Sequence, residues 1–135
     1  MDGVILTPLK QIHHPKGDIY HAMKQSDEGF CGFGEAYFST IAQGEIKGWK
    51  CHTQMVLNLV VPLGEIEFVL YNADTKDFFC VTLSQQNYKR LSVQPHIWMA
   101  FRGLGEHNML LNIASIEHNP AEALTKDLSE IDYEW

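Results

Sequence analysis

Short apolar runs recur along the whole chain at a spacing of roughly ten residues, and Gly, Pro, Asn and Asp separate them. A run of this length between turn-forming residues is typical of a β-strand, and such even spacing favours a sandwich or a barrel. We therefore predict an all-β fold. Its expected strands are Val4–Leu9, Ile19–Met23, Glu35–Ala42, Met55–Val61, Ile66–Tyr71, Phe78–Leu83, Arg90–Val93, Ile97–Phe101 and Met109–Ala114.

The C-terminal part of the chain differs from this pattern. Pro120–Lys126 places Pro at a first-turn position before Ala-Glu-Ala-Leu, which predicts one short, peripheral helix. Acidic residues outnumber basic ones in the same region, and we expect them to form a solvated acidic face. These residues are Glu117, Glu122, Asp127, Glu130, Asp132 and Glu134.

Length and composition indicate one domain over residues 1–135, with 45% hydrophobic and 20% charged residues. A net charge of −7 argues against a nucleic-acid partner, because phosphate binding needs clustered Lys and Arg. No apolar stretch approaches the ~18 residues of a membrane span. The three cysteines lack metal or redox spacing. We expect a reduced, cytoplasmic protein with neither a membrane nor a nucleic-acid partner.

The segment Gly44–Gly64 has a distinctive spacing: Gly, five residues, an H-x-H position, four residues, an acid position, six residues and Gly. This frame resembles the barrel motif of the cupins. Here Lys50-Cys51-His52 stands at the H-x-H position and Leu57 at the acid position, and the histidine of the second cupin motif falls at Met99. One histidine among these positions is too few to hold Zn, Fe or Mn. We therefore expect no metal and no other cofactor.

Further segments widen the resemblance. The chain resembles the cupin family of dTDP-4-dehydrorhamnose 3,5-epimerases and the related dTDP-sugar 3,4-ketoisomerases. The resemblance implies a cupin-type β-barrel (jelly roll), a homodimer, and proton transfer on a nucleotide-linked 4-keto-6-deoxy sugar in cell-surface polysaccharide synthesis. The matching segments are Lys16–Tyr20 (KGDIY), Ile46–His52 (IKGWKCH), Leu83–Asn87 (LSQQN), Gln94–Phe101 (QPHIWMAF) and Ile131–Trp135 (IDYEW).

The catalytic positions of that family are only partly kept. The histidine that acts as base in the epimerases is replaced by Lys50, and the tyrosine that acts as acid is replaced by Asn112. His52 matches the second histidine of the ketoisomerase pattern RGxHxH. The resemblance therefore implies the substrate class more firmly than the type of isomerisation.

Lys50 and His52 are the candidate catalytic residues. Strand alternation puts both on one face, with Cys51 on the other. Moving a proton next to a ketone needs a base above the C–H bond and a group that stabilises the enolate. An unperturbed histidine titrates near ~6.5 and a lysine near ~10.4. We predict His52 as base and Lys50 as the group that polarises the carbonyl or carries the second proton. Burial of Lys50 would exchange these roles.

Five further residues are predicted to bind substrate. Lys47 stands at the family's Arg position and would contact the diphosphate, Tyr37 and Asn112 would orient sugar hydroxyls, Trp49 would stack on the ligand, and Arg102 would face the cavity mouth. The alternative hypothesis is a non-catalytic cupin that binds a sugar or sugar nucleotide, which the missing histidine and tyrosine favour.

Overall fold

Antiparallel strands make up almost all of the regular structure in the computed structural model, which describes residues 1–135. Two single 3₁₀ turns, η1 (Pro120–Glu122) and η2 (Leu128–Glu130), are the only helical segments. The strands are β1 (Val4–Pro8), β2 (Gln11–Ile12), β3 (Ile19–Tyr20), β4 (Glu35–Ala42), β5 (Ile46–His52), β6 (Leu57–Leu63), β7 (Glu65–Asn72), β8 (Asp77–Ser84), β9 (Lys89–Val93), β10 (Trp98–Gly103), β11 (His107–Ala114) and β12 (Ala123–Thr125).

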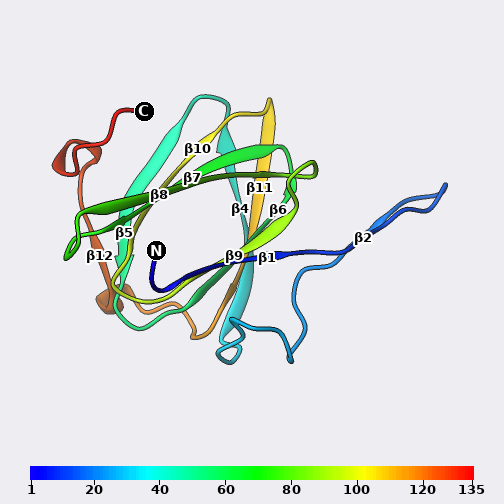
Figure 1. The fold of residues 1–135 in the computed structure, drawn as a ribbon, viewed down its shortest axis with the longest axis horizontal. Helices are drawn as coiled ribbons and strands as arrows, with labels where there is room; N and C mark the ends of the chain where they lie inside the picture. The colour runs from blue at the N-terminus through cyan, green and yellow to red at the C-terminus, as the bar shows by residue number, and fades with distance from the viewer.

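The strands form two five-stranded sheets that face each other (Figure 1). The first sheet has the order β1-β9-β6-β11-β4, and the second has the order β12-β5-β10-β7-β8. The predicted all-β cupin fold is confirmed, as a jelly roll whose two sheets do not close into one continuous barrel. Nine predicted strands recur as β1, β3, β4 and β6 to β11, with bounds that differ by a few residues at most.

Side-chain alternation explains how the sheets pack. Ile66, Phe68 and Leu70 of β7 point into the core between the sheets, whereas Val69 points outward. The outward residue is buried too, because Ile131 and the rest of the C-terminal segment cover that face. The second sheet thus lies between the core and the C-terminal segment, so its strand β5 is fixed from both sides.

The predicted helix over Pro120–Lys126 is wrong. The chain turns once at η1, where the Asn119 side chain accepts a hydrogen bond from the Ala121 amide at 3.1 Å. It then continues as β12, which pairs with β5 from His52 to Lys50. Strand pairing therefore outweighs the helix propensity of Ala-Glu-Ala-Leu.

The expected acidic face is also wrong at one position. Glu122 is buried with 4% exposure, because its carboxylate turns inward between β5 and β6 instead of outward to solvent. The inward direction of its side chain brings the Glu122 carboxylate to His52.

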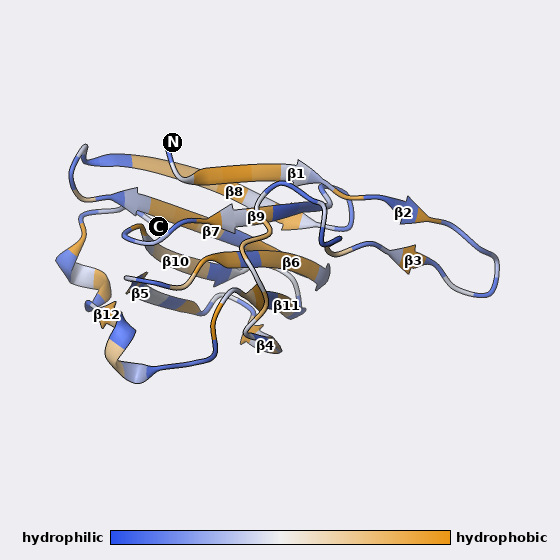
Figure 2. Ribbon diagram, turned by 90° about the horizontal axis from the view of Figure 1, so that it is seen from below, coloured by the Kyte–Doolittle hydropathy of each residue, from blue (hydrophilic) through white to orange (hydrophobic).

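A hairpin of β2 and β3 extends away from the two sheets (Figures 1 and 2). It is held by two register pairs, Gln11 with Tyr20 and Ile12 with Ile19, and both isoleucines are exposed. No helix in the structure is long and apolar enough to cross a membrane.

Candidate active site

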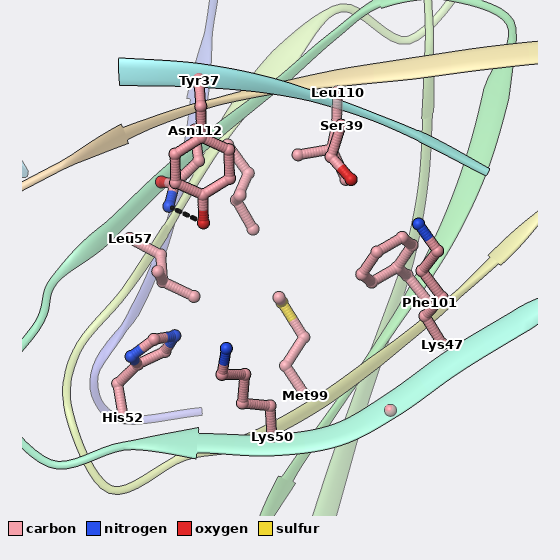
Figure 3. Close-up of a pocket in the computed structure, with 12 residues that line it drawn as sticks. Tyr37, Ser39, Lys47, Lys50, His52, Leu57, Met99, Phe101, Leu110 and Asn112 are labelled. Carbon is pink, nitrogen blue, oxygen red and sulfur yellow. Dashed lines mark hydrogen bonds between the residues drawn. The ribbon is translucent and has the colours of Figure 1, made fainter. Parts of the chain in front are cut away.

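A cavity of about 230 Å³ opens between the two sheets. One wall comes from β5 and β10, and the facing wall comes from β4, β6 and β11 (Figure 3). Polar groups stand at both walls and apolar side chains lie between them. The lining residues are Tyr37, Ser39, Lys47, Gly48, Lys50, His52, Leu57, Leu59, Met99, Phe101, Leu110 and Asn112.

A bulge in β5 brings three predicted residues to the same wall. Strict alternation would turn Lys47 away from Lys50 and His52, because their sequence positions differ in parity. The register of β5 against β10 shifts, so that Lys50 pairs with Met99 but Lys47 pairs with Phe101. The extra residue in β5 restores a common face for all three side chains, and each lines the cavity (Figure 3).

Glycine at position 48 permits this bulge. Gly48 has φ of +153°, and a Cβ there would lie 2.3 Å from the Cβ of Ala100. Only a residue without a side chain fits this close approach of β5 and β10.

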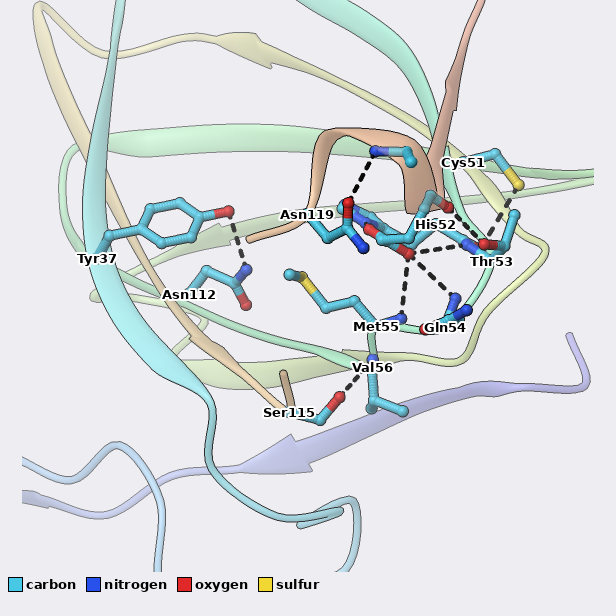
Figure 4. A network of polar contacts seen from close by, with 12 residues as sticks. Tyr37, Cys51, His52, Thr53, Gln54, Met55, Val56, Asn112, Ser115 and Asn119 are labelled. Carbon is cyan, nitrogen blue, oxygen red and sulfur yellow. Dashed lines mark hydrogen bonds and ion pairs between the residues drawn. The ribbon is translucent and has the colours of Figure 1, made fainter. Parts of the chain in front are cut away.

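His52 is held by a buried carboxylate that the sequence did not reveal as part of the site. Its Nδ1 contacts Oε1 of Glu122, while Oε2 of Glu122 accepts hydrogen bonds from the amides of Thr53, Gln54 and Met55 at 3.1, 3.0 and 3.3 Å (Figure 4). Burial tends to raise the pKa of Glu122, but the hydrogen bonds from His52 and from the Gln54 and Met55 amides outweigh burial, and the pKa lies below its ordinary value.

This contact fixes the chemistry of the imidazole. An ionised carboxylate only accepts hydrogen bonds, so Nδ1 of His52 must carry the proton. In the neutral ring Nε2 then holds the lone pair, and Nε2 is the nitrogen that Glu122 leaves free. His52 lines the cavity and is therefore set up as a proton acceptor there.

Tyr37 and Asn112 lie on the opposite wall. The Asn112 Nδ2 amide donates a hydrogen bond to the Tyr37 hydroxyl at 3.1 Å (Figures 3 and 4). Asn112 is 1% exposed, whereas Tyr37 is 42% exposed. Both predicted residues thus line the cavity with His52 and Lys50.

Lys47 closes the other end of the cavity. Its Nζ donates a hydrogen bond to the Thr40 carbonyl oxygen at 2.7 Å, which links β5 to β4 across the gap between the sheets. An ammonium has three donors, so two remain for a ligand.

Two predicted residues lie outside the cavity. Trp49 is 1% exposed and packs on the outer side of the second sheet, where its Nε1 donates to the Leu128 carbonyl oxygen at 3.3 Å. Arg102 follows Phe101, which takes the inward position, and pairs with Glu67 at 3.0 Å. The predictions that Trp49 stacks on the ligand and that Arg102 faces the mouth are therefore corrected.

Cys51 lies on the outer side as predicted from alternation, in a cluster with Trp49 and Trp98. Burial raises the pKa of its thiol, and the charge of Glu122 acts in the same direction. No group of three or more His, Cys, Asp or Glu residues could hold a metal ion.

These features define the class: a jelly roll of cupin type with a cavity of about 230 Å³ between its sheets and a His–Glu pair at the cavity wall. No protein-family model and no curated protein matches the sequence. Solved structures do match. A dTDP sugar isomerase from Desulfovibrio desulfuricans G20 shares 29% identity with a TM-score of 0.93, over 99% of this chain and 91% of that chain.

Two more distant structures share the fold. A variant of the 3,4-ketoisomerase QdtA from Thermoanaerobacterium thermosaccharolyticum, in complex with TDP-4-keto-6-deoxyglucose, has a TM-score of 0.80 at 19% identity, over 92% of this chain and 88% of that chain. The 3,5-epimerase RmlC from Legionella pneumophila Philadelphia 1, in complex with dTDP-4-keto-L-rhamnose, has a TM-score of 0.85 at 15% identity, over 100% and 79%. The predicted resemblance to the cupin family of dTDP-sugar 3,5-epimerases and 3,4-ketoisomerases is confirmed.

Proposed function

We propose that the protein is a metal-independent epimerase or ketoisomerase that acts on a nucleotide-linked 4-keto-6-deoxy sugar. The reaction removes a proton from the carbon next to the ketone, forms an enolate or enediol, and returns a proton to carbon. A 4-keto sugar has acidic α-protons, so the chemistry needs a base, an acid and a cation but no redox group.

The residues at the cavity divide these tasks. Nε2 of His52 takes the α-proton, and the ammonium of Lys50, two residues along the same wall, stabilises the developing enolate oxygen. Lys50 is solvent-exposed, which suits a cation better than a base. Lys47 holds the diphosphate, and Tyr37 contacts sugar oxygens from the facing wall, where Asn112 orients its hydroxyl.

The observation that carries this proposal is the buried Glu122 beside His52. Burying a carboxylate to 4% exposure costs free energy unless the carboxylate accepts hydrogen bonds. The Glu122 oxygens accept them from the His52 imidazole and from three backbone amides. A cupin that only binds sugar has no need of an imidazole with a defined tautomer. The non-catalytic alternative is for that reason the weaker one.

Solvent exchange tests the proposal. TDP-4-keto-6-deoxyglucose that is incubated with the protein in D₂O should gain deuterium at the carbon next to the ketone. NMR measures the rate of this exchange. His52→Ala should reduce the exchange rate by about 10²- to 10⁴-fold and leave binding largely intact. Exchange that survives in His52→Ala but vanishes in Lys50→Met would move the base role to Lys50. If wild-type protein exchanged none of several keto sugars, a binding role would replace catalysis.

We also propose a cellular location, a pathway and an oligomeric state for the protein. A place in cell-surface polysaccharide synthesis is what the resemblance implies, and a cytoplasmic location is what the three free cysteines favour. A homodimer is supported by β4, an edge strand of the first sheet, by Phe38 on that strand and by Phe33 just before it, each 64% exposed. The projecting β2–β3 hairpin also has exposed apolar side chains that a second copy could cover.

A further inference from the structure

Tyr37 and Asn112 are direct partners in the β4–β11 pair. Side chains at paired antiparallel positions stand about 4.5–5.5 Å apart at Cβ, so one can set the geometry of the other. Asn112 lines the cavity with only 1% exposure, whereas Tyr37 is 42% exposed and reaches over the cavity (Figure 3). The buried amide is therefore the fixed partner and the phenol is the one that meets a ligand.

The direction of their hydrogen bond determines where the phenol proton points. Nδ2 of an asparagine only donates, so the Tyr37 oxygen accepts in the 3.1 Å contact. The hydroxyl proton of Tyr37 is then not used in this bond. It is free to point into the cavity, toward whatever oxygen or carbon lies there.

A second bond fixes the orientation of the amide. Oδ1 of Asn112 accepts a hydrogen bond from the backbone amide of Asn58 at 3.2 Å. Rotation of the amide by 180° would place an NH₂ group against this N–H and remove the acceptor. Asn112 can therefore present only its donor side to Tyr37.

Asn58 is anchored in turn by buried groups on the outer side of the first sheet. Its Oδ1 accepts from Ser92 Oγ at 2.6 Å, and its Nδ2 donates to the Gly29 carbonyl oxygen at 3.0 Å. Asn58 and Ser92 are 2% and 1% exposed. Gly29 packs so closely that a Cβ there would lie 2.6 Å from Ser92 Oγ. The chain of bonds from Gly29 to Tyr37 is thus held rigidly.

We infer that Asn112 is a positioning residue that directs the hydroxyl proton of Tyr37 into the cavity, so that Tyr37 is the proton donor of the proposed reaction. The inference rests on the proposed function and assigns its missing acid. Tyr37 gives its proton to the enolate carbon, which forms the new C–H bond, and becomes a phenolate, while His52 keeps the proton that it removed. The Asn112 amide still donates to the phenolate oxygen and stabilises its charge. Solvent then returns both residues to their resting forms.

Two substitutions separate this role from packing. Asn112→Asp keeps the shape and the acceptor for Asn58, but a carboxylate would draw the phenol proton toward itself and repel a phenolate. Asn112→Leu removes the donor without adding charge. We expect kcat for deuterium exchange into TDP-4-keto-6-deoxyglucose to fall by about 10²-fold in Asn112→Asp and by about 10-fold in Asn112→Leu, with KM changed little.

A purely structural role predicts the opposite order, because the isosteric Asp fits the site better than Leu. Asn108→Asp is the matched control, since Asn108 is a buried asparagine on the same strand that bonds Glu65, Gly105 and Ile41 outside the cavity. It should lower stability but leave exchange per folded molecule within about threefold of wild type. Asn112→Asp with wild-type kcat, or with more activity than Asn112→Leu, would overturn the inference.

A double-mutant cycle gives an independent measurement. In a Tyr37→Phe background, Asn112→Leu should cost no further activity, because Asn112 acts only through the Tyr37 hydroxyl, which that background already lacks. Losses that multiply would contradict the inference.

Ser92→Ala serves if the Asn112 variants fail to fold, because it loosens Asn58 more gently. This change should lower kcat by about threefold to tenfold, and an unchanged kcat would count against the inference. Wild-type protein without exchange would overturn the proposed function itself, and this inference with it.

Discussion

Glu122 determines how the site responds to pH. Its pKa is depressed in the folded protein, because hydrogen bonds from His52 and the Gln54 and Met55 amides outweigh the effect of burial. A depressed carboxyl pKa contributes stability that is complete above the unfolded value near 4.5 and is lost as the pH falls through the lower folded value. Acid should therefore release His52 from its partner while the protein unfolds.

Glu122→Gln should remove this contribution. We expect the variant to be less stable than wild type at pH 7, with the difference in free energy of unfolding shrinking as the pH falls below about 4.5. Urea unfolding of both proteins at a series of pH values measures this difference in free energy of unfolding. Asp18 and Asp27, whose pKa values are also lowered, are present in both proteins, so their effects cancel. A difference that stays constant from pH 7 to pH 3 would show that the Glu122 charge does not stabilise the fold.

Lys47 should act on binding and not on turnover. It lies at the end of the cavity away from His52 and would touch only the diphosphate (Figure 3). Lys47→Ala should raise the Kd for TDP by about tenfold and leave kcat nearly unchanged, measured by calorimetry and by exchange. Part of the loss could come from the bond to the Thr40 carbonyl oxygen, so the melting temperature of the variant is the control. A fall in kcat at constant Kd would place Lys47 in the chemistry.

The bulge in β5 is the element on which the site depends. Gly48→Ala should destabilise the protein by about 2–3 kcal/mol, because the added Cβ would meet Ala100 and the backbone there has a φ that other residues rarely adopt. Gly44→Ala is the control, since Gly44 has positive φ but no atom within 4 Å, and should cost only about 1 kcal/mol. Thermal unfolding compares the two. Equal losses would mean that the clash is relieved elsewhere.

The strands themselves were predictable because their signals are local. Apolar runs and turn residues located β6 to β11, and alternation placed Lys50 and His52 together with Cys51 opposite. Glu122 could not be recognised, because a carboxylate in an acidic segment looks solvated until β12 pairs with β5 and turns it inward. The same long-range pairing overrode the helix propensity of that segment.

Trp49 and Arg102 show a second limit of the same reasoning. Trp49 has the same parity as Cys51, and both lie on the outer face, so regular alternation from Lys50 already opposes a stacking role for Trp49. The β5–β10 register shift changes the face of Lys47 instead. For Arg102 the neighbour Phe101 takes the inward position, and Glu67 provides a partner on the outer side. Neither the register shift nor the Glu67 partner can be recognised from residue types alone.

Considered as a whole, the chain divides its two sheets between different tasks. The second sheet is covered by the core on one side and by the C-terminal segment on the other, which fixes β5 and brings Glu122 to His52. The first sheet carries Tyr37 on β4, an edge strand with no neighbour beyond it. The wall that presents the phenol therefore borders an open surface, and an association of two copies there would protect the site.

The open edge at β4 predicts a dimer. Light scattering at micromolar concentration should give twice the 15.4 kDa mass of one chain. Phe38→Glu should yield monomers, because it would place a charge in an apolar surface that is buried only on association. Leu124→Glu, at an exposed residue of the other sheet, should remain dimeric and serves as the control. Exchange activity that falls with dissociation would link the dimer to the site at Tyr37, whereas a monomeric wild-type protein would exclude the dimer.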